Sequence, residues 1–393
     1  MSRNVPNLRF KGFEDEWKEK KLINFLSESR IPGSNGSKAK KLTVKLWAKG
    51  VVPKKEIYEG SDNTKYYTRK AGQLIYGKLD FLNCAFGIVP DHLDGYESTV
   101  DAPAFDIKNI NPYFLFSKII QKNFYKRNGD IADGSRKAKR IHSDVFLNMS
   151  IKVPSLQEQE KIANFLSKVD SIIEKQEKKV EYWNSYKKGM MQKIFSQKIR
   201  FKDENGMDYP EWKINKIENI ATIEMGFTPS TKNDEAWNGN IEWLSIAGMN
   251  SKYIYSGNKK ISSEILGKRK LVPIDTLIMS FKLTIGRLAI VKKEIVTNEA
   301  ICQFYWKSKD ISNEYMYAYL SVINIESFGC RAAKGITLNT ESLNSIVVKL
   351  PCLEEQTKIA NFLSNIDNII EKESKKLEEL KQWKKGLLQQ LFV

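Results

Sequence analysis

Residues 154–195 read PSLQEQEKIANFLSKVDSIIEKQEKKVEYWNSYKKGMMQKIF, and residues 351–392 read PCLEEQTKIANFLSNIDNIIEKESKKLEELKQWKKGLLQQLF. The two stretches align without a gap, and 24 of their 42 paired positions are identical. A match of this length does not arise by chance in a chain of this composition, so it indicates an internal duplication. The chain is therefore expected to consist of two similar halves, each ending in the repeated stretch.

Apolar residues recur at steps of three and four in both copies, which predicts two amphipathic helices. At about 1.5 Å per residue each helix would be roughly 57 Å long, which is too long for an ordinary core helix. Two matching helices in one chain are expected to pack on each other as an intramolecular coiled coil. The alternative is that each helix packs only on its own domain. The expected interface residues are Ile162, Leu166, Val169, Ile173, Val180 and Trp183 in the first helix, and Ile359, Leu363, Ile366, Ile370, Leu377 and Leu380 in the second.

The composition favours a protein with real cores and a polyanionic partner. The 393 residues suffice for two or three domains, 41% of them are hydrophobic, and the formal net charge is +17. Nucleic acid is the first candidate partner for such a charge. No signal peptide and no apolar run of 18 residues is found, so a cytoplasmic protein without a membrane partner is expected. The isolated cysteines, Cys84, Cys302, Cys330 and Cys352, favour neither a metal site nor a disulfide framework.

The repetition continues more weakly outside the helices. Residues 8–22 and 199–217 share an Arg-Phe start and a Trp-Lys pair near the end, and residues 72–90 and 275–293 each predict a strand, a turn and a second strand. Before each long helix, Ser143 or Thr340 is expected to cap a short helix that leads into a strand. The expected segments are a lead-in (1–22), a first globular domain (23–153), a first long helix (154–198), a second lead-in (199–217), a second globular domain (218–350) and a second long helix (351–393).

Basic residues gather in glycine-containing segments just before the two short helices. A basic loop with glycine can approach phosphates closely, and an arginine there can bind the O6 and N7 atoms of guanine together. A solvated loop without a ligand is the alternative for any one of these residues. Two further candidates lie near the turn expected within 275–293. The candidate DNA-binding residues are Lys126, Arg127, Arg136, Lys137, Lys139 and Arg140 in the first half, and Lys282, Arg287, Arg331 and Lys334 in the second.

The sequence offers no convincing catalytic constellation. An adenine methyltransferase, for example, would need a glycine-rich turn that binds S-adenosylmethionine. The sequence contains no GxG. The nearest match to an adenine-holding Asn-Pro-Pro-Tyr element is residues 111–114, which lack the second proline and read better as a helix started by Pro112. A nuclease pattern through Asp91, Asp106 and Lys108 is too loose to separate from chance. A non-catalytic protein without a metal or cofactor of its own is therefore expected.

The repeated PxLxEQxKIANFLSxxDxxIE motif, at 154–174 and 351–371, resembles the specificity subunit of type I restriction-modification systems. The opening of the second domain, GFTPSTKNDEAWNGNIEWLSIAGM at 226–249, and the RF…EW lead-ins are similar to the same family. The resemblance covers essentially the whole chain in order. It implies an α/β (α+β) fold with two target-recognition domains, an internal duplication, and two long conserved helices that form an antiparallel coiled coil.

The resemblance also implies a function. Each target-recognition domain would read one half of a bipartite, gapped site on double-stranded DNA, and the helices would set the spacing and dock two adenine methyltransferase subunits. S-adenosylmethionine would bind to those subunits, and two restriction (motor-nuclease) subunits would complete the complex. The specificity subunit itself would perform no chemistry. The alternative is a non-catalytic coiled-coil DNA-binding scaffold without sequence specificity, which would explain the helices and the charge but not two unlike globular domains.

Overall fold

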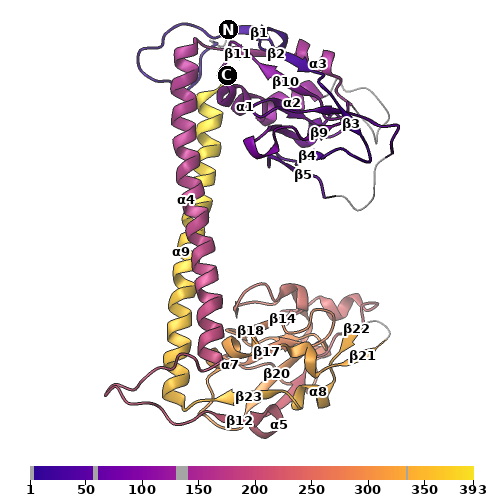
Figure 1. The fold of residues 1–393 in the computed structure, drawn as a ribbon. Coiled ribbons are helices and arrows are strands. Elements are labelled where there is room, and N and C mark those ends of the chain that lie inside the picture. Colours follow the sequence, from indigo (N-terminus) through magenta and orange to yellow (C-terminus); the bar gives the residue numbers. More distant parts are fainter. Residues whose placement is uncertain (1–3, 56–60, 130–139, 333–334) are drawn as a thin grey trace. The chain divides into compact units, whose positions relative to one another are not determined.

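The computed structural model describes residues 4–55, 61–129, 140–332 and 335–393, and it divides into two compact units. The first unit comprises Met1–Glu177 and Lys375–Val393, and the second comprises Lys178–Ser374. Each unit therefore contains one globular part together with one segment of each long helix (Figure 1).

The first unit is a mixture of short strands and helices followed by the first long helix. Its strands are β1 (Lys18–Lys21), β2 (Leu26–Ser29), β3 (Pro32–Asn35), β4 (Leu42–Val44), β5 (Val51–Pro53), β6 (Lys65–Thr68), β7 (Leu74–Tyr76), β8 (Phe86–Ile88), β9 (Glu97–Ser98), β10 (Ala104–Ile107) and β11 (Ser150–Val153). Its helices are α1 (Pro112–Ile119), α2 (Lys122–Gly129), α3 (Ser143–Asn148) and the start of α4 (Leu156–Phe195).

The central sheet of the first unit has the order β2-β10-β7-β8, with antiparallel neighbours. The same unit has smaller sheets of order β3-β6-β9, β4-β5 and β1-β11. The β1-β11 pair joins the lead-in to the strand just before α4, with Lys18 opposite Val153. The lead-in is thus part of the folded unit at the point where the long helix begins.

The second unit repeats this plan with a larger sheet. Its strands are β12 (Lys213–Lys216), β13 (Ala221–Met225), β14 (Ile241–Leu244), β15 (Tyr253–Ile254), β16 (Lys259–Ile261), β17 (Leu277–Ser280), β18 (Leu288–Val291), β19 (Val296–Thr297), β20 (Ile301–Trp306), β21 (Cys330–Ala332), β22 (Gly335–Thr337) and β23 (Val347–Leu350). Its helices are α5 (Ile217–Ile220), α6 (Ser263–Leu266), α7 (Asn313–Leu320), α8 (Thr340–Asn344) and the start of α9 (Leu353–Leu391).

The central sheet of the second unit has the order β13-β20-β17-β18-β15, in which the β15–β18 pair is parallel. The same unit has a three-stranded sheet, β16-β14-β19, the lead-in pair β12-β23 and the hairpin β21-β22. The strand-turn-strand expectation is confirmed in both units, because β7 pairs with β8 and β17 with β18. The mixture of helices with mainly antiparallel sheets confirms the expected α/β (α+β) class.

The expected helix caps were wrong by one residue. His142 precedes α3 without a capping side-chain hydrogen bond, whereas Ser143 is the first helical residue and its hydroxyl donates 3.0 Å to Glu28 Oε1. In the second unit, Asn339 rather than Thr340 is the cap, and its side chain accepts a hydrogen bond from the Ser342 amide at 2.8 Å. An asparagine and a following threonine are both good caps by residue type, so the choice depended on where the backbone turns into the helix.

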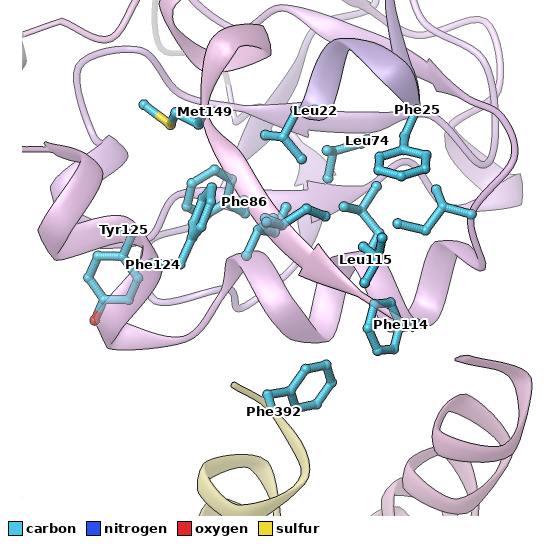
Figure 2. Close-up of a cluster of buried hydrophobic side chains, with 14 of the residues drawn as sticks. Leu22, Phe25, Leu74, Phe86, Phe114, Leu115, Phe124, Tyr125, Met149 and Phe392 are labelled. Atoms are coloured by element: carbon cyan, nitrogen blue, oxygen red, sulfur yellow. The ribbon is translucent and has the colours of Figure 1, made fainter. Parts of the chain in front are cut away.

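The long helices contribute to the core of each unit at both of their ends. In the first unit, Phe392 follows the end of α9 and its ring centroid lies 5.2 Å from that of Phe114 on α1 (Figure 2). In the second unit, Phe195 at the end of α4 meets Tyr315 and Tyr319 of α7 edge-on, with centroids 5.9 and 5.3 Å away. Burial of these aromatic rings joins the end of each long helix to a globular core.

The two long helices pack on each other in an antiparallel sense, which confirms the expected helix pair (Figure 1). In the first unit, Lys384 Nζ lies 2.5 Å from Asp170 Oδ1, and Lys381 Nζ lies 2.6 Å from Glu177 Oε1. Residue numbers therefore rise along α4 while they fall along α9, as an antiparallel pair requires.

The second unit contains the duplicate of the first of these pairs. Lys187 Nζ lies 2.5 Å from Asp367 Oδ1, and Asp367 occupies the position of Asp170 in the repeated stretch, as Lys384 occupies that of Lys187. A further pair joins Lys179 to Glu373 at 2.7 Å. Such partly exposed pairs contribute little stability each, but opposite charges at matched positions favour one register of the two helices over its neighbours.

Candidate nucleic-acid interface

A buried glutamate at the start of each long helix connects that helix to the lead-in. In the first unit, Arg9 donates two hydrogen bonds of 2.8 Å to the carboxylate of Glu158, and the indole of Trp17 donates another at 3.4 Å. The side chain of Glu158 is 2% exposed. Hydrogen bonding to this carboxylate raises the pKa of Arg9, so the guanidinium stays charged at neutral pH.

The second unit repeats this arrangement residue for residue. Arg200 donates to Glu355 from Nε at 3.2 Å and from Nη2 at 2.8 Å, and the indole of Trp212 donates at 3.0 Å. Phe201 packs edge-on against Phe362, and Phe10 packs in the same way against Phe165 in the first unit. The shared RF…EW lead-ins and the repeated Glu therefore form the junction between globular part and helix.

The glutamine that follows each of these glutamates positions a short helix of the globular part. Gln159 Oε1 accepts a hydrogen bond from the Asn111 amide at 3.0 Å, and Gln356 Oε1 accepts one from the Ser312 amide at 2.9 Å. Asn111 and Ser312 are the N-caps of α1 and α7. Sequence reasoning missed these roles, although the retained Glu-Gln pair in both copies was a signal of them. The same contacts at the start of each long helix therefore position two globular parts that differ in sequence.

Most residues expected at the helix interface lie in the two cores. In the first unit these are Ile162, Leu166, Val169 and Ile173, with Leu377 and Leu380 packed against the same core. In the second unit they are Ile359, Leu363 and Ile366, with Ile370 and Trp183 packed against that core. Val180 is half-buried. The helices thus pack both on each other and on the globular parts, so the two alternatives for the apolar stripe are not exclusive.

The first unit places three of its candidate DNA-binding residues on the surface. Lys126 and Arg127 are exposed in the last turn of α2, and Arg140 Nε lies 3.6 Å from Asp101 Oδ1. The candidates Arg136, Lys137 and Lys139 lie outside the described residues.

A cavity of about 600 Å³ in the first unit lies beside one of these candidates. Its charged lining residues are Glu19, Lys118, Arg127, Asp144 and Lys152. Burial lowers the pKa of Lys118 to about 8, and its ammonium donates to the carbonyl of Val393. Because two carboxylates face the cations, the cavity does not have the uniform positive charge expected of a phosphate site.

The second unit places its described candidates on two strand hairpins. Lys282 and Arg287 are exposed in the connection between β17 and β18, where Arg287 Nη1 donates 3.0 Å to the carbonyl of Ile246. Arg331 lies on β21, and Lys334 lies outside the described residues.

A further basic segment of the second unit was missed by sequence reasoning. Lys268, Arg269 and Lys270 are consecutive and exposed after α6. The Arg269 guanidinium lies 4.2 Å from the centroid of the Phe227 ring, and Lys259 Nζ lies 4.7 Å from that of Trp237. Cations interleaved with aromatic rings are typical of surfaces that bind nucleic acid. The GKRK string at 267–270 was the available signal, but it does not precede a short helix as the other basic segments do.

The residues considered for catalysis are placed apart from one another or in structural roles. Residues 111–114 form the capped start of α1, as the helix interpretation predicted. Asp106 lies on β10 and accepts a hydrogen bond from Gln73 Nε2 at 2.9 Å, while Asp91 lies in a separate 3₁₀ turn. Across the described ranges, no group of three His, Cys, Asp or Glu side chains is arranged to hold a metal ion. In the same part of the chain, no helix combines the length and apolar character needed to span a membrane.

A protein-family model, the type I restriction modification DNA specificity domain, matches residues 102–182 and 209–382. The chain is similar to the MjaVIII type I restriction enzyme specificity subunit of Methanocaldococcus jannaschii, with 26% identity over 272 residues. That match spans 64% of this chain and 63% of the relative, so it covers less than two thirds of the relative's length.

Two solved structures share the fold. One, from work on complex assembly and conformational transition of the type I restriction-modification system, has a TM-score of 0.59 at 16% identity and covers 96% of this chain and 98% of its own. The other, a type I restriction-modification S subunit from M. genitalium, has a TM-score of 0.55 at 12% identity and covers 99% of both chains. The family match extends over more than half of the chain and includes parts of both units. The chain belongs to the family of type I restriction-modification DNA specificity subunits.

Proposed function

We propose that this protein gives a type I restriction-modification complex its DNA sequence specificity, with each unit reading one half of a two-part site. The observation that carries the proposal is that the two units share the contacts between long helix and globular part but differ in their exposed loops. Both units share the Glu-Arg-Trp junction and the glutamine that positions a short helix, yet their exposed loops differ in sequence. Two unlike reading surfaces on one repeated frame suit an asymmetric DNA target.

In this proposal the chain contributes binding and positioning, and its partners contribute the chemistry. Two adenine methyltransferase subunits would dock along α4 and α9 and bind S-adenosylmethionine, and two restriction subunits would complete the complex. The net charge of +17 supports binding to DNA through its phosphates. The work would take place in the cytoplasm on double-stranded DNA, and this chain would hold neither metal nor cofactor.

The proposal is tested by co-expressing the chain with its methyltransferase partner subunit and mapping modified adenines across the host genome. We expect a gapped, two-part motif that is methylated only when both proteins are present. Methylation by this chain alone would contradict its non-catalytic role. Binding without any motif, lost altogether as salt rises, would instead favour a scaffold without sequence specificity.

Removing the basic segment after α6 is expected to weaken DNA binding and reduce its salt dependence. Replacing Lys268, Arg269 and Lys270 with alanine removes three exposed charges. If each contacts a phosphate, the slope of log K against log salt becomes less steep by about 2 to 3. Fluorescence anisotropy of a labelled duplex at a series of salt concentrations measures this slope.

The matched control is a triple alanine variant of Lys202, Lys213 and Lys216, which are exposed on the second lead-in. It has the same net charge as the first variant. Equal slopes for the two variants would mean that the segment after α6 acts only through net charge.

Lengthening both long helices by one heptad is expected to widen the gap in the methylated motif. Inserts after Glu177 and after Ser374, where the two units divide, would keep the apolar stripes nearly in register. Seven residues add about 10 Å of helix, which corresponds to about three base pairs at 3.4 Å each. Mapping of modified adenines would show the same two half-sites farther apart, whereas an unchanged gap would exclude the helices as the spacer. An insert in only one helix serves as the control, because it breaks the pairing.

A further inference from the structure

The most exposed large apolar side chain of the described residues is Leu283, which is 96% exposed. It lies in the connection between β17 and β18 of the second unit, and its φ angle is +65°. Leucine is disfavoured in this left-handed region, and full exposure gives its side chain no contact that would offset the cost. An unfavourable backbone that displays an apolar side chain is typical of a functional site rather than of a folding requirement.

The turn that carries Leu283 is held by several hydrogen bonds. The Thr284 amide donates 2.8 Å to the Lys282 carbonyl, which closes a three-residue turn around Leu283. The Gly286 amide donates 2.8 Å to the carbonyl of the fully buried Ser280, whose hydroxyl donates to the Thr284 carbonyl. Hydrogen bonds on both sides of Leu283 therefore define the turn, and the leucine side chain is displayed to solvent.

Phe281 fixes the start of this connection, and Lys282 and Arg287 give the connection positive charge. Phe281 is 1% exposed, and its amide donates 3.0 Å to the Ala300 carbonyl. Lys282 Nζ lies 5.1 Å from the centroid of the Phe281 ring, and the Arg287 side chain reaches the Ile246 carbonyl at the other end of the connection. The connection that displays Leu283 therefore also carries two exposed cations, which suit contacts with phosphates close to the bases.

The first unit displays an apolar residue at a comparable place. Trp47, between β4 and β5, is 53% exposed with a φ angle of +59°. Its amide donates 2.8 Å to the carbonyl of Asn83, and the Ala48 amide donates 2.8 Å to that of Cys84, so this loop is fixed to the β7–β8 connection. Each unit thus displays a large apolar side chain on a left-handed residue. Leu283 lies within the β17–β18 connection, whereas Trp47 lies in a different loop that is hydrogen-bonded to the β7–β8 connection.

We propose that Leu283 packs against the bases of the half-site that the second unit reads. The inference rests on the proposed function and adds to it a specificity-determining residue. Apolar side chains contact DNA either at the C5-methyl group of thymine or between two partly unstacked base pairs. In both cases the leucine is buried only in the complex, so its contribution is absent from the stability of the free protein.

The test compares Leu283→Ala with Ile274→Ala in the intact chain bound to its methyltransferase. Ile274 is 55% exposed and precedes β17, whereas Leu283 follows it, so the two lie at opposite ends of one strand. The probe is a duplex carrying the motif found by adenine mapping. Leu283→Ala is expected to weaken binding about tenfold, whereas Ile274→Ala leaves it unchanged. The slope of affinity against salt stays the same in both, because no charge is removed.

Two further measurements locate the contact on the DNA. When the second half-site is scrambled, the loss caused by Leu283→Ala should disappear, whereas scrambling the first half-site should leave it in place. Replacing thymines of the second half-site by uracil, or placing 2-aminopurine there, distinguishes a methyl contact from an opened base step. Leu283→Gly is expected to raise the melting temperature while it weakens DNA binding, since glycine tolerates the positive φ.

The inference fails if Leu283→Ala and Ile274→Ala bind the duplex equally well while the wild-type chain prefers its motif over a scrambled duplex. Failure of the proposed function looks different, because the wild-type chain itself would then show no such preference. A loss for Leu283→Ala that persists with the second half-site scrambled would also overturn it, since the contact would not be to those bases.

Discussion

Replacing Glu355 with alanine is expected to lower the free energy of unfolding of the second unit by about 3 kcal/mol. The Glu355 side chain is fully buried, and it accepts hydrogen bonds from Arg200 and Trp212. Without the carboxylate, the Arg200 guanidinium keeps only the carbonyls of Tyr209 and Pro210 and a 3.8 Å ion pair with Glu211. The Arg200 side chain is only 18% exposed, so it regains little hydration, and the buried indole N–H loses its acceptor. Hydrogen exchange by mass spectrometry would show faster exchange in the globular part of the second unit.

The neighbouring Glu354 supplies a matched control, because it is exposed and one residue away in the same first turn of α9. Its replacement by alanine removes the same charge near the same helix end without removing a buried ion pair, so the expected loss stays below about 1 kcal/mol. Similar exchange in both variants would show that the buried pair is not what holds the junction together.

A double-mutant cycle with Arg200 would measure the pair itself. If Arg200→Ala is introduced together with Glu355→Ala, the double variant should be less destabilised than the sum of the two single variants, because neither partner is then left alone. Glu158 and Arg9 offer the same cycle in the first unit, where the carboxylate is 2% exposed. Destabilisation of the unit that carries the substitution, with the other unit unaffected, is the expected result for each.

The duplication made the frame of this fold predictable from sequence. The repeated stretches gave α4 and α9 to within a few residues, because an apolar stripe with a period near 3.6 over 40 residues has few other solutions. The β7–β8 and β17–β18 hairpins followed from β-forming residues on either side of a turn. Local patterns of this kind depend on neighbours in the chain, which sequence reasoning can see.

The contacts that position the units were not predictable in the same way. Glu355 and Arg200 are 155 residues apart, and nothing local to either distinguishes a buried carboxylate from the solvated glutamates around it. Leu283 lies beside the turn that the sequence predicted within 275–293, but the pattern of β-forming residues does not show that this leucine is fully exposed on a left-handed residue. Which residues contact DNA stays a prediction for the same reason, since phosphates and bases select surfaces rather than sequence patterns.

Replacing Phe195 with alanine is expected to destabilise the second unit by about 3 to 4 kcal/mol. Phe195 is the last residue of α4 and is 9% exposed, with its ring edge-on to Tyr315 and Tyr319 of α7. Removing the ring leaves a cavity between the helix end and the core, and each of the two tyrosines loses one of its aromatic contacts. Thermal unfolding and hydrogen exchange would both report the loss, with faster exchange in α7.

The control for Phe195 is Tyr182→Ala on the same helix. Tyr182 is 60% exposed, and its ring contacts are with Trp183 and Tyr186 on the helix surface, so its loss should cost less than about 1 kcal/mol. Since Phe195 ends the helix that begins in the first unit, Phe195→Ala also tests whether this helix end affects recognition of the second half-site. If the end of α4 fixes the second reading surface, Phe195→Ala should reduce the sequence preference of methylation at the second half-site. The sequence preference at the first half-site should stay unchanged in the methylation map. Equal loss of sequence preference at both half-sites would mean that the core of each unit depends on the core of the other. The two junctions between long helix and globular part would then not be independent.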